Sequence, residues 1–245
     1  MTAAPAAAPP APPKSRLRHE VESWARAIGV ALAVWLVLKA YLIEAFRIPS
    51  PSMENTLLVG DFLFVNKVVF GGEFSIPFTG VRFGKLPGYG TPRRGEVVVF
   101  RSVEDSTPTL SVVKRIIGAP GDTLQMVSDT IYLNGRPQDE PYALHLGSDP
   151  NADLFYRRQI LENQLPYYVG ADPASYRPNT HDWGPIVVPP GHFFMMGDNR
   201  DESYDSRFWG FLPEAHVLGR PLFIYFSVDT RPLRFRFNRL FKRPK

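Results

Sequence analysis

The sequence contains no cysteine among its 245 residues, and this absence removes several kinds of chemistry at once. The chain can form no disulfide bond, use no thiol as a nucleophile and bind no metal through thiolates. The bulk composition excludes much less, because 44% hydrophobic and 21% charged residues are ordinary for a globular protein. We therefore expect one sizeable folded domain with accessory segments, and no wholesale disorder.

Several familiar functional motifs are also missing. The sequence has five histidines but no H-E-x-x-H pattern, and no serine lies in a G-x-S-x-G elbow. The polar stretch 197–210 lacks the glycine and the terminal glutamate that a calcium-binding loop needs. No helix-turn-helix, zinc-finger or RNA-binding signature accompanies the net charge of +4. We therefore expect no metal, no cofactor and no nucleic-acid partner.

Most of the excess positive charge lies at the C-terminal end of the chain. The last fifteen residues contain seven basic side chains and no acidic one. These basic residues are Arg231, Arg234, Arg236, Arg239, Lys242, Arg243 and Lys245. Such a segment favours a tail that is solvated or faces anionic lipid over specific nucleic-acid binding. We therefore expect residues 231–245 to form a basic C-terminal tail.

The N-terminal part of the chain divides into a polar stretch and an apolar stretch. Residues 1–26 begin with alanine and proline and end with basic residues, which predicts a disordered, cytoplasmic tail. Residues 27–38 are wholly apolar, and as a helix residues 27–46 would span about 30 Å, the thickness of a bilayer core. This pattern predicts one transmembrane anchor, with a cleaved signal peptide or a buried core helix as alternatives. Basic residues before the segment favour a cytoplasmic N-terminus, with residues 47–245 on the other side of the membrane.

Between residues 47 and 230 the pattern predicts a mostly β, antiparallel domain. Short apolar and β-branched runs alternate with turn signals, and no long amphipathic helix is evident. The runs are 57–59, 62–70, 97–100, 110–117, 130–133, 186–188, 192–196 and 222–228. Asn134-Gly135 predicts a tight hairpin turn. Residues 140–185 show no clear period, so we expect an inserted region with little regular structure.

The segment just beyond the apolar stretch has two serines between prolines, in the order Ile48-Pro49-Ser50-Pro51-Ser52-Met53. A linker is one interpretation; the other is a rigid turn that presents a serine nucleophile, which needs a base to accept its proton. Lys114 interrupts a predicted strand whose neighbours are apolar. It either faces water from an edge strand, or it is buried and neutral enough to be that base.

The polar stretch 197–210 is dense in aspartate, arginine and serine. One interpretation is a polar loop or a cation site. The other is a loop that bonds to itself, in which Asp205 pairs with Arg207 and fixes Ser203 against something buried.

Taken together, these segments resemble the bacterial type I signal peptidases, a family of serine proteases with a Ser/Lys dyad. The resemblance covers about 47–70, 93–135 and 186–228. The motifs that carry it are Ile48-Pro49-Ser50-x-Ser52-Met53, Leu57-x-x-Gly60-Asp61, Arg94-Gly95-Glu96-Val97-Val98-Val99-Phe100, Lys114-Arg115-x-x-Gly118-x-Pro120-Gly121-Asp122 and the block from Gly197 to Gly210. The family implies an antiparallel β-domain behind one N-terminal transmembrane helix.

The resemblance also implies a role for each matching residue. Ser52 resembles the nucleophile and Lys114 the general base. Ser50 matches the hydroxyl that joins the Ser52 N–H in the oxyanion hole, and Ser203 matches the residue that orients the lysine amine. The remaining matches are a supporting ion pair, Asp205 and Arg207, and the lining of a pocket for small side chains, Ile48, Met53 and Val113.

Members of this family remove signal peptides from exported preproteins after Ala-x-Ala-like sites, at the outer face of the bacterial cytoplasmic membrane. The resemblance therefore implies preprotein signal peptides and the phospholipid membrane as partners. Pro51 departs from the glycine that many members have, and Glu54-Asn55 replace a common proline, so substrate preference near the serine stays open. Two rival functions remain. They are a Ser/Lys self-cleaving repressor-type protease, which predicts an N-terminal DNA-binding domain, and a non-catalytic membrane-anchored β binding module.

Overall fold

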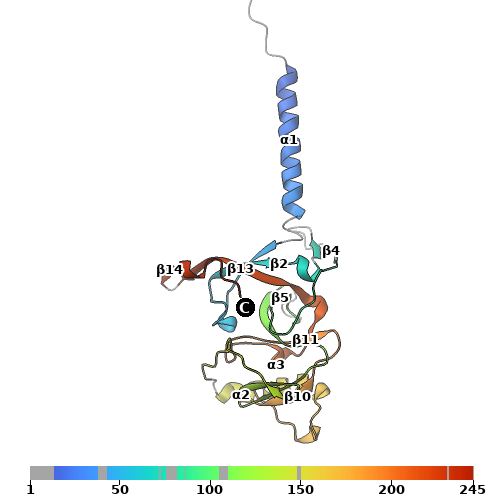
Figure 1. Cartoon of the computed structure of the whole chain (residues 1–245), viewed down its shortest axis with the longest axis vertical. Helices are drawn as coiled ribbons and strands as arrows, with labels where there is room; N and C mark the ends of the chain where they lie inside the picture. The colour runs from blue at the N-terminus through green and yellow to red at the C-terminus, as the bar shows by residue number, and fades with distance from the viewer. Residues whose placement is uncertain are drawn as a thin grey trace, which may run out of the picture. The chain divides into compact units, whose positions relative to one another are not determined.

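The protein forms two compact units, residues 1–39 and residues 40–245. The computed structural model describes residues 14–37, 43–71, 73–75, 82–85, 87–104, 110–147, 150–230 and 232–244. Figure 1 shows one long helix in the first unit and a set of strands with short helices in the second.

The described element of the first unit is helix α1, Lys14–Val37. The large apolar side chains that the structure describes on this helix are between 48% and 70% exposed. They are Val21, Trp24, Ile28, Val30, Leu32, Val34 and Trp35. No helix in the described part of the chain has both the length and the apolar character that a membrane span requires.

The expected helix over residues 27–46 differs from the structure at both ends. α1 begins at Lys14, so the prediction of a disordered tail is wrong for residues 14–26. Residues 38–42 lie outside the described residues, and strand β1, Ile43–Arg47, occupies the positions that follow. β1 pairs antiparallel with β2, Asp61–Asn66, along its whole length. Hydrogen bonding to β2 and the charge of Glu44 explain why this apolar-looking stretch is a strand, which corrects the prediction for these residues.

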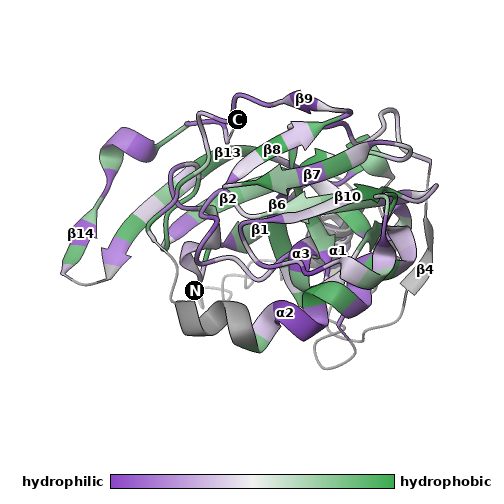
Figure 2. Ribbon diagram, turned by 90° about the horizontal axis from the view of Figure 1, so that it is seen from below, coloured by the Kyte–Doolittle hydropathy of each residue, from purple (hydrophilic) through white to green (hydrophobic). Residues whose placement is uncertain are grey.

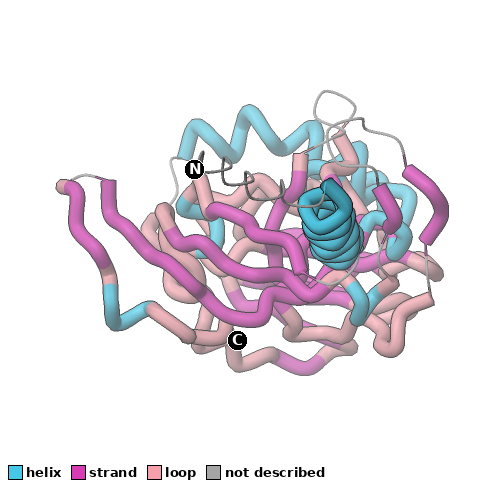
Figure 3. Tube along the Cα trace, turned by 90° about the horizontal axis from the view of Figure 1, so that it is seen from above, coloured by secondary structure: helices cyan, strands magenta, loops and turns pink. Residues whose placement is uncertain are grey.

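Within the described residues of the second unit, an eight-stranded antiparallel sheet has the order β1-β2-β13-β5-β6-β11-β12, with β14 paired to β13. The further strands of this sheet are β5 Val97–Arg101, β6 Ser111–Gly118, β11 His192–Met196, β12 Leu212–Pro213, β13 Val217–Thr230 and β14 Leu233–Phe235. A second sheet, in the order β10-β7-β8-β9, contains β7 Thr123–Val127, β8 Thr130–Leu133, β9 Arg136–Pro137 and β10 Trp183–Val187. Strands β3, Glu73–Ser75, and β4, Arg82–Lys85, pair with each other. Figure 3 shows the longer strands running side by side across this unit.

Short helices connect these strands. They are η2 Pro51–Met53, η3 Val68–Phe70, η4 Leu165–Tyr167, η5 Pro173–Ser175, α3 Ser206–Trp209, η6 Glu214–His216 and η7 Phe237–Arg239.

The mostly β, antiparallel prediction is confirmed, and two of its strands, β8 and β11, begin and end where the sequence predicts. The predicted hairpin is also present, because Asn134 and Gly135 both have positive φ, 51° and 79°, between β8 and β9. The run 57–59 is not a strand; it forms part of a turn in which Leu57 is fully buried.

The sheet separates two apolar clusters, and the alternation along β5 shows this directly. Val97 and Val99 belong to the cluster that contains Ile48 and Met53. Their neighbours on β5, Val98 and Phe100, belong to the cluster that contains Phe193 and Met195. Because successive side chains of a strand point to opposite faces, β5 and its partner β6 are buried on both faces.

The inserted region, residues 140–185, contains more regular structure than the sequence indicates. It includes helix α2, Pro150–Gln164, and the first residues of β10. α2 packs on α3 through Tyr156, whose ring centroid lies 4.7 Å from that of Phe208. The hydrophobic period of α2 is weak, because among residues 155–164, whose side chains are described, only Ile160 and Gln164, four positions apart, are buried.

The basic C-terminal segment is not a free tail, which corrects that prediction. The amide of Ile224 in β13 donates to the Lys242 carbonyl, and the Phe241 amide donates to the Ile224 carbonyl. Arg239 is buried and forms a two-pronged ion pair with Asp61, which has no solvent exposure. The segment is therefore part of the fold, because one of its arginines neutralises a buried carboxylate.

Candidate active site

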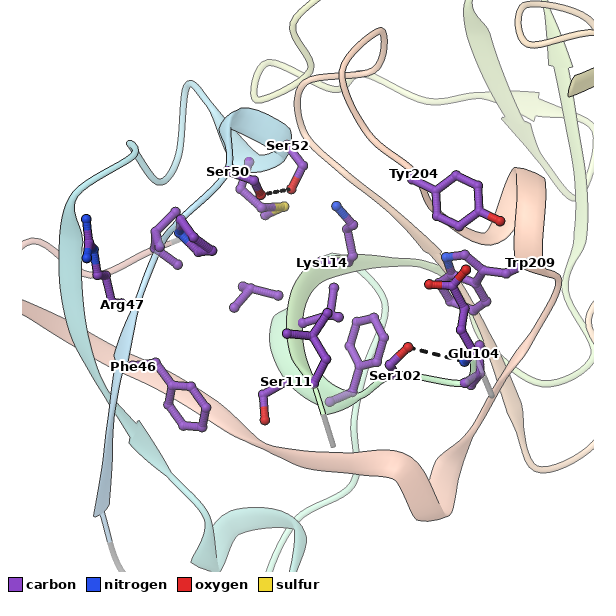
Figure 4. Close-up of a pocket in the computed structure, with 18 of the residues that line it drawn as sticks. Phe46, Arg47, Ser50, Ser52, Ser102, Glu104, Ser111, Lys114, Tyr204 and Trp209 are labelled. Carbon is purple, nitrogen blue, oxygen red and sulfur yellow. Dashed lines mark hydrogen bonds between the residues drawn. The ribbon is translucent and has the colours of Figure 1, made fainter. Parts of the chain in front are cut away.

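Two predicted catalytic groups line one pocket with a volume of about 280 Å³. Ser52 lies in η2, the short helix that Pro51 opens, and Lys114 lies in β6. Figure 4 shows the Lys114 side chain pointing toward Ser52 across this pocket. The predicted pocket residues Ile48, Met53 and Val113 line the same cavity, as does Ser50.

The turn that carries Ser52 is tied to the loop that follows β11. The backbone amide of Asn199 donates to the Ser52 carbonyl at 3.2 Å, and the Asn199 side-chain amide donates to the Pro51 carbonyl at 3.3 Å. The hydroxyl oxygens of Ser50 and Ser52 lie 3.3 Å apart. The turn therefore has a fixed conformation, and it presents two hydroxyls to one pocket.

Lys114 is buried, with 2% of its surface exposed, so the interpretation of a lysine facing water is wrong. Burial lowers the pKa of its amine to about 8; Asp205 and Asp198 oppose this effect, and Arg207 adds to it. In the described part of the structure the amine forms no hydrogen bond and no ion pair. An amine with a pKa of about 8 is uncharged in about a tenth of the molecules at pH 7 and in about half of them at pH 8.

Ser203 lies beside the dyad but has no bond to it. Its hydroxyl is buried and forms no hydrogen bond with Lys114 in the described structure, and it helps to lower the pKa of the neighbouring Asp205 carboxyl. Gly197 explains how close the segments approach, since a Cβ there would lie 2.2 Å from the Ser203 hydroxyl and 2.4 Å from the Ser52 carbonyl. Only glycine fits at this position without a shift of the site.

The loop between β11 and α3 bonds to itself through the predicted pair. Arg207 donates two hydrogen bonds to Asp205, at 2.9 and 3.0 Å, and both side chains are buried. Arg207 also donates to the carbonyl of Arg200 at 2.6 Å, and Asp205 accepts from the amide of Gly197 at 3.1 Å. Burial alone would raise the pKa of Asp205, but the charge and hydrogen bonds of Arg207 outweigh it and lower that pKa.

A second buried ion pair was not assigned a role from the sequence. Arg115 donates to Asp198 at 2.8 and 2.7 Å, and it also bonds to Thr56 at 3.2 Å. Its guanidinium lies 3.8 Å from the centre of the Tyr142 ring. The strand period could have indicated this role. Arg115 follows Lys114 in β6, so its side chain must point to the opposite face of the strand.

A third cluster of polar groups connects the loop after β11 to residues 140–142. Arg200 is buried and donates two hydrogen bonds to Glu140, at 2.9 and 2.8 Å. Glu140 also accepts a bond from the Tyr142 hydroxyl. In the residues that the structure describes, no group of three or more His, Asp or Glu side chains is arranged to hold a metal ion.

The chain is similar in sequence to known proteins. The family described as "Signal peptidase, peptidase S26" matches residues 21–226. Signal peptidase I of Pseudomonas fluorescens is 36% identical over 211 residues, which cover 80% of this chain and 69% of that protein. Signal peptidase I of Bacillus licheniformis is 32% identical over 214 residues, which cover 86% and 92%. A solved signal peptidase I from Enterococcus faecalis, 28% identical and covering 53% of this chain and 96% of its own, has a TM-score of 0.35, which is too low to bear on the fold.

Proposed function

Because this chain belongs to the signal peptidase family, peptidase S26, we propose that Ser52 is its nucleophile and Lys114 its general base. The chain is a serine peptidase that removes signal peptides from preproteins. The observation that carries the residue assignment is a serine hydroxyl and a buried lysine of lowered pKa lining one pocket.

In the proposed reaction the Ser52 oxygen attacks the scissile carbonyl carbon while Lys114 accepts the hydroxyl proton. The C–N bond then breaks, and Lys114 gives that proton to the leaving amine. Water, activated by the same amine, hydrolyses the acyl-enzyme and restores the serine. The Ser50 hydroxyl, 3.3 Å from that of Ser52, is close enough to donate to the developing oxyanion together with the Ser52 N–H.

The residues around the dyad have proposed positioning roles. The Ser203 hydroxyl is buried and forms no bond to Lys114 in the described structure, and we propose that it accepts a hydrogen bond from, or donates one to, the Lys114 amine in the substrate complex. Catalytic hydrogen bonds are often long in free enzymes and shorten when the substrate binds. The ion pair of Asp205 and Arg207 stabilises the loop that contains Ser203, and so keeps Ser203 near Lys114.

An open strand edge supports the proposed mode of substrate binding. β6 pairs with β5 from Ser111 onward, but its pairing with β11 begins only at Arg115. The opposite edge of residues 111–114 is therefore unpaired in the described structure and borders the pocket. An extended preprotein segment added to this edge gains backbone hydrogen bonds, while Ile48, Met53 and Val113 leave room for alanine-sized side chains.

We also propose that the enzyme works at a bilayer, with its N-terminus cytoplasmic and its β unit outside the bacterial cytoplasmic membrane. An aromatic face on β2, β13 and the C-terminal segment supports this, because eight rings form a continuous series of contacts with centroids 4.2 to 6.2 Å apart. They are Phe62, Phe64, Phe223, Tyr225, Phe226, Phe235, Phe237 and Phe241. Figure 2 shows hydrophobic and hydrophilic residues alternating along β14, where exposed Arg234 lies between Leu233 and Phe235. Exposed aromatic rings next to basic side chains are typical of surfaces that contact anionic lipid.

The test is cleavage of a preprotein by the detergent-solubilised full chain. We expect one cut after a small residue, and no cut by the Ser52→Ala variant at equal concentration. Ser175→Ala is the matched control, because Ser175 is exposed and lies outside the pocket. Cleavage by Ser52→Ala at the rate of the unchanged chain would refute the assignment, and binding without cleavage by the unchanged chain would favour a binding module.

A further inference from the structure

The two faces of β6 lead to different parts of the pocket. Val113 packs with the apolar cluster that contains Ile48 and Met53. Its neighbour Val112 packs with the other cluster, against which Trp209 also packs. A substrate strand added beside residues 111–114 alternates in the same way, so its side chains point in turn to these two faces.

Because of this alternation, the substrate residue between two small anchoring residues contacts a different side of the pocket from the one that the small residues contact. If the two small side chains occupy the Ile48 and Val113 side, the residue between them points to the Val112 and Trp209 side. Tyr204 completes this second wall of the pocket.

The second wall also contains two carboxylates. Glu104 and Glu202 both line the pocket, and Figure 4 shows Glu104, Tyr204 and Trp209 gathered on the same side of it. The Glu104 backbone is held in place because its amide donates to the Ser102 hydroxyl at 3.2 Å. In the described part of the chain neither carboxylate forms an ion pair. The pKa of Tyr204 is raised, first by burial and also by the negative charge of Glu104.

We propose that this wall makes the enzyme select for a lysine or arginine at the substrate residue between the two small anchoring residues. The aliphatic stem of such a side chain packs on the rings of Tyr204 and Trp209, and its charged end reaches Glu104 and Glu202. A glutamate at the same position would face two like charges. This inference rests on the proposed function, since it extends the substrate class of the same site.

The test uses three internally quenched peptides that differ only at the middle residue, with Ala-Lys-Ala, Ala-Gln-Ala or Ala-Glu-Ala before the scissile bond. An exposed ion pair changes an equilibrium constant by up to about fivefold, and a like-charge contact opposes binding by a comparable factor. We therefore expect kcat/KM of the full chain to be about tenfold higher for the lysine peptide than for the glutamate peptide. In the Glu104→Gln/Glu202→Gln variant this ratio should fall to about one, and in Glu104→Lys/Glu202→Lys it should invert.

Each ratio is measured within one protein, so partial unfolding of a variant does not change it. Glu214→Gln is the matched control, because it removes the same charge from an exposed residue outside the pocket and should keep the original ratio. Equal cleavage of the lysine and glutamate peptides by the unchanged chain would overturn the inference and leave the proposed function standing. A preference that survives the double substitution would also overturn it. Cleavage of none of the peptides or of a preprotein would instead count against the proposed function.

Discussion

At the scale of single residues, Lys114 combines a chemical advantage with a cost in stability. Its burial lowers the pKa of the amine from 10.5 to about 8, so the neutral form that can accept a proton becomes accessible. Below about pH 8 the amine is protonated in both the folded and the unfolded chain, and the folded chain then bears the full cost of a buried charge. Between about pH 8 and 10.5 only the unfolded chain keeps the proton, so the contribution of this group to stability rises with pH.

The Lys114→Met variant should therefore lose activity and gain stability. At pH 6 its free energy of unfolding should exceed that of the unchanged chain by up to about 3 kcal/mol, less any loss of packing, and the gap should narrow by about 1 kcal/mol by pH 9. Chemical unfolding of the β unit in detergent at both pH values measures this difference. If Lys114→Met is less stable than the unchanged chain by the same amount at pH 6 and pH 9, burial does not lower the pKa of the amine.

At the scale of structural elements, the loop from Gly197 to Arg207 determines whether the two catalytic segments meet. Its first part contacts the Ser52 turn through Asn199, and its second part carries Ser203. The pair of Asp205 and Arg207 closes this loop and caps α3, since Asp205 accepts from the Arg207 amide at 3.2 Å. Buried charge therefore holds this loop, together with the stacking of Tyr204 on Phe208.

Substitution of one member of that pair should lower the free energy of unfolding more than substitution of both. Asp205→Ala leaves a buried guanidinium without its partner, so we expect a loss of about 3–5 kcal/mol in the free energy of unfolding. Asp205→Leu with Arg207→Met removes both charges and should lose less. Asp139→Ala, at an exposed residue, is the control and should stay within about 0.5 kcal/mol of the unchanged chain. A double variant as unstable as Asp205→Ala would show that the pair matters for shape and not for charge balance.

The sequence indicated the local structure of the two proposed catalytic residues better than it indicated the elements around them. Local motifs and strand period placed Ser52 and Lys114 correctly in a turn and a strand. Helix α2 was missed, because a helix that buries only a narrow stripe has no strong hydrophobic period. The ion pair of Arg239 with Asp61 was missed as well, since the two residues are 178 positions apart and nothing local specifies such a contact.

At the scale of the whole molecule, the β unit has one face that does not follow the usual rule for antiparallel sheets. A face that is not packed on the core is normally polar, but here Phe62 and Phe64 alternate along β2 with buried residues and continue the aromatic face. Phe235, Phe237 and Phe241 are 51%, 76% and 74% exposed. A surface of this kind needs a partner, and a lipid surface fits its aromatic and basic character.

Tryptophan reporters test this surface in the full chain reconstituted into bilayers that contain brominated lipid. We expect the emission of Phe237→Trp to be quenched, after subtraction of the four native tryptophans. Phe155→Trp is the control, because Phe155 is 78% exposed on α2 and does not belong to the aromatic face. Equal quenching at both positions, or at neither, would contradict a lipid contact through the aromatic face.

The dyad itself is tested most directly by the pH dependence of kcat/KM for one preprotein peptide. This quantity reports the ionisation of essential groups in the free enzyme. With Lys114 as the base, kcat/KM should rise about tenfold per pH unit at low pH and level off above the pKa of about 8. Lys114→Ala should stay inactive throughout. A flat profile between pH 6 and 9, or full activity of Lys114→Ala, would contradict the account.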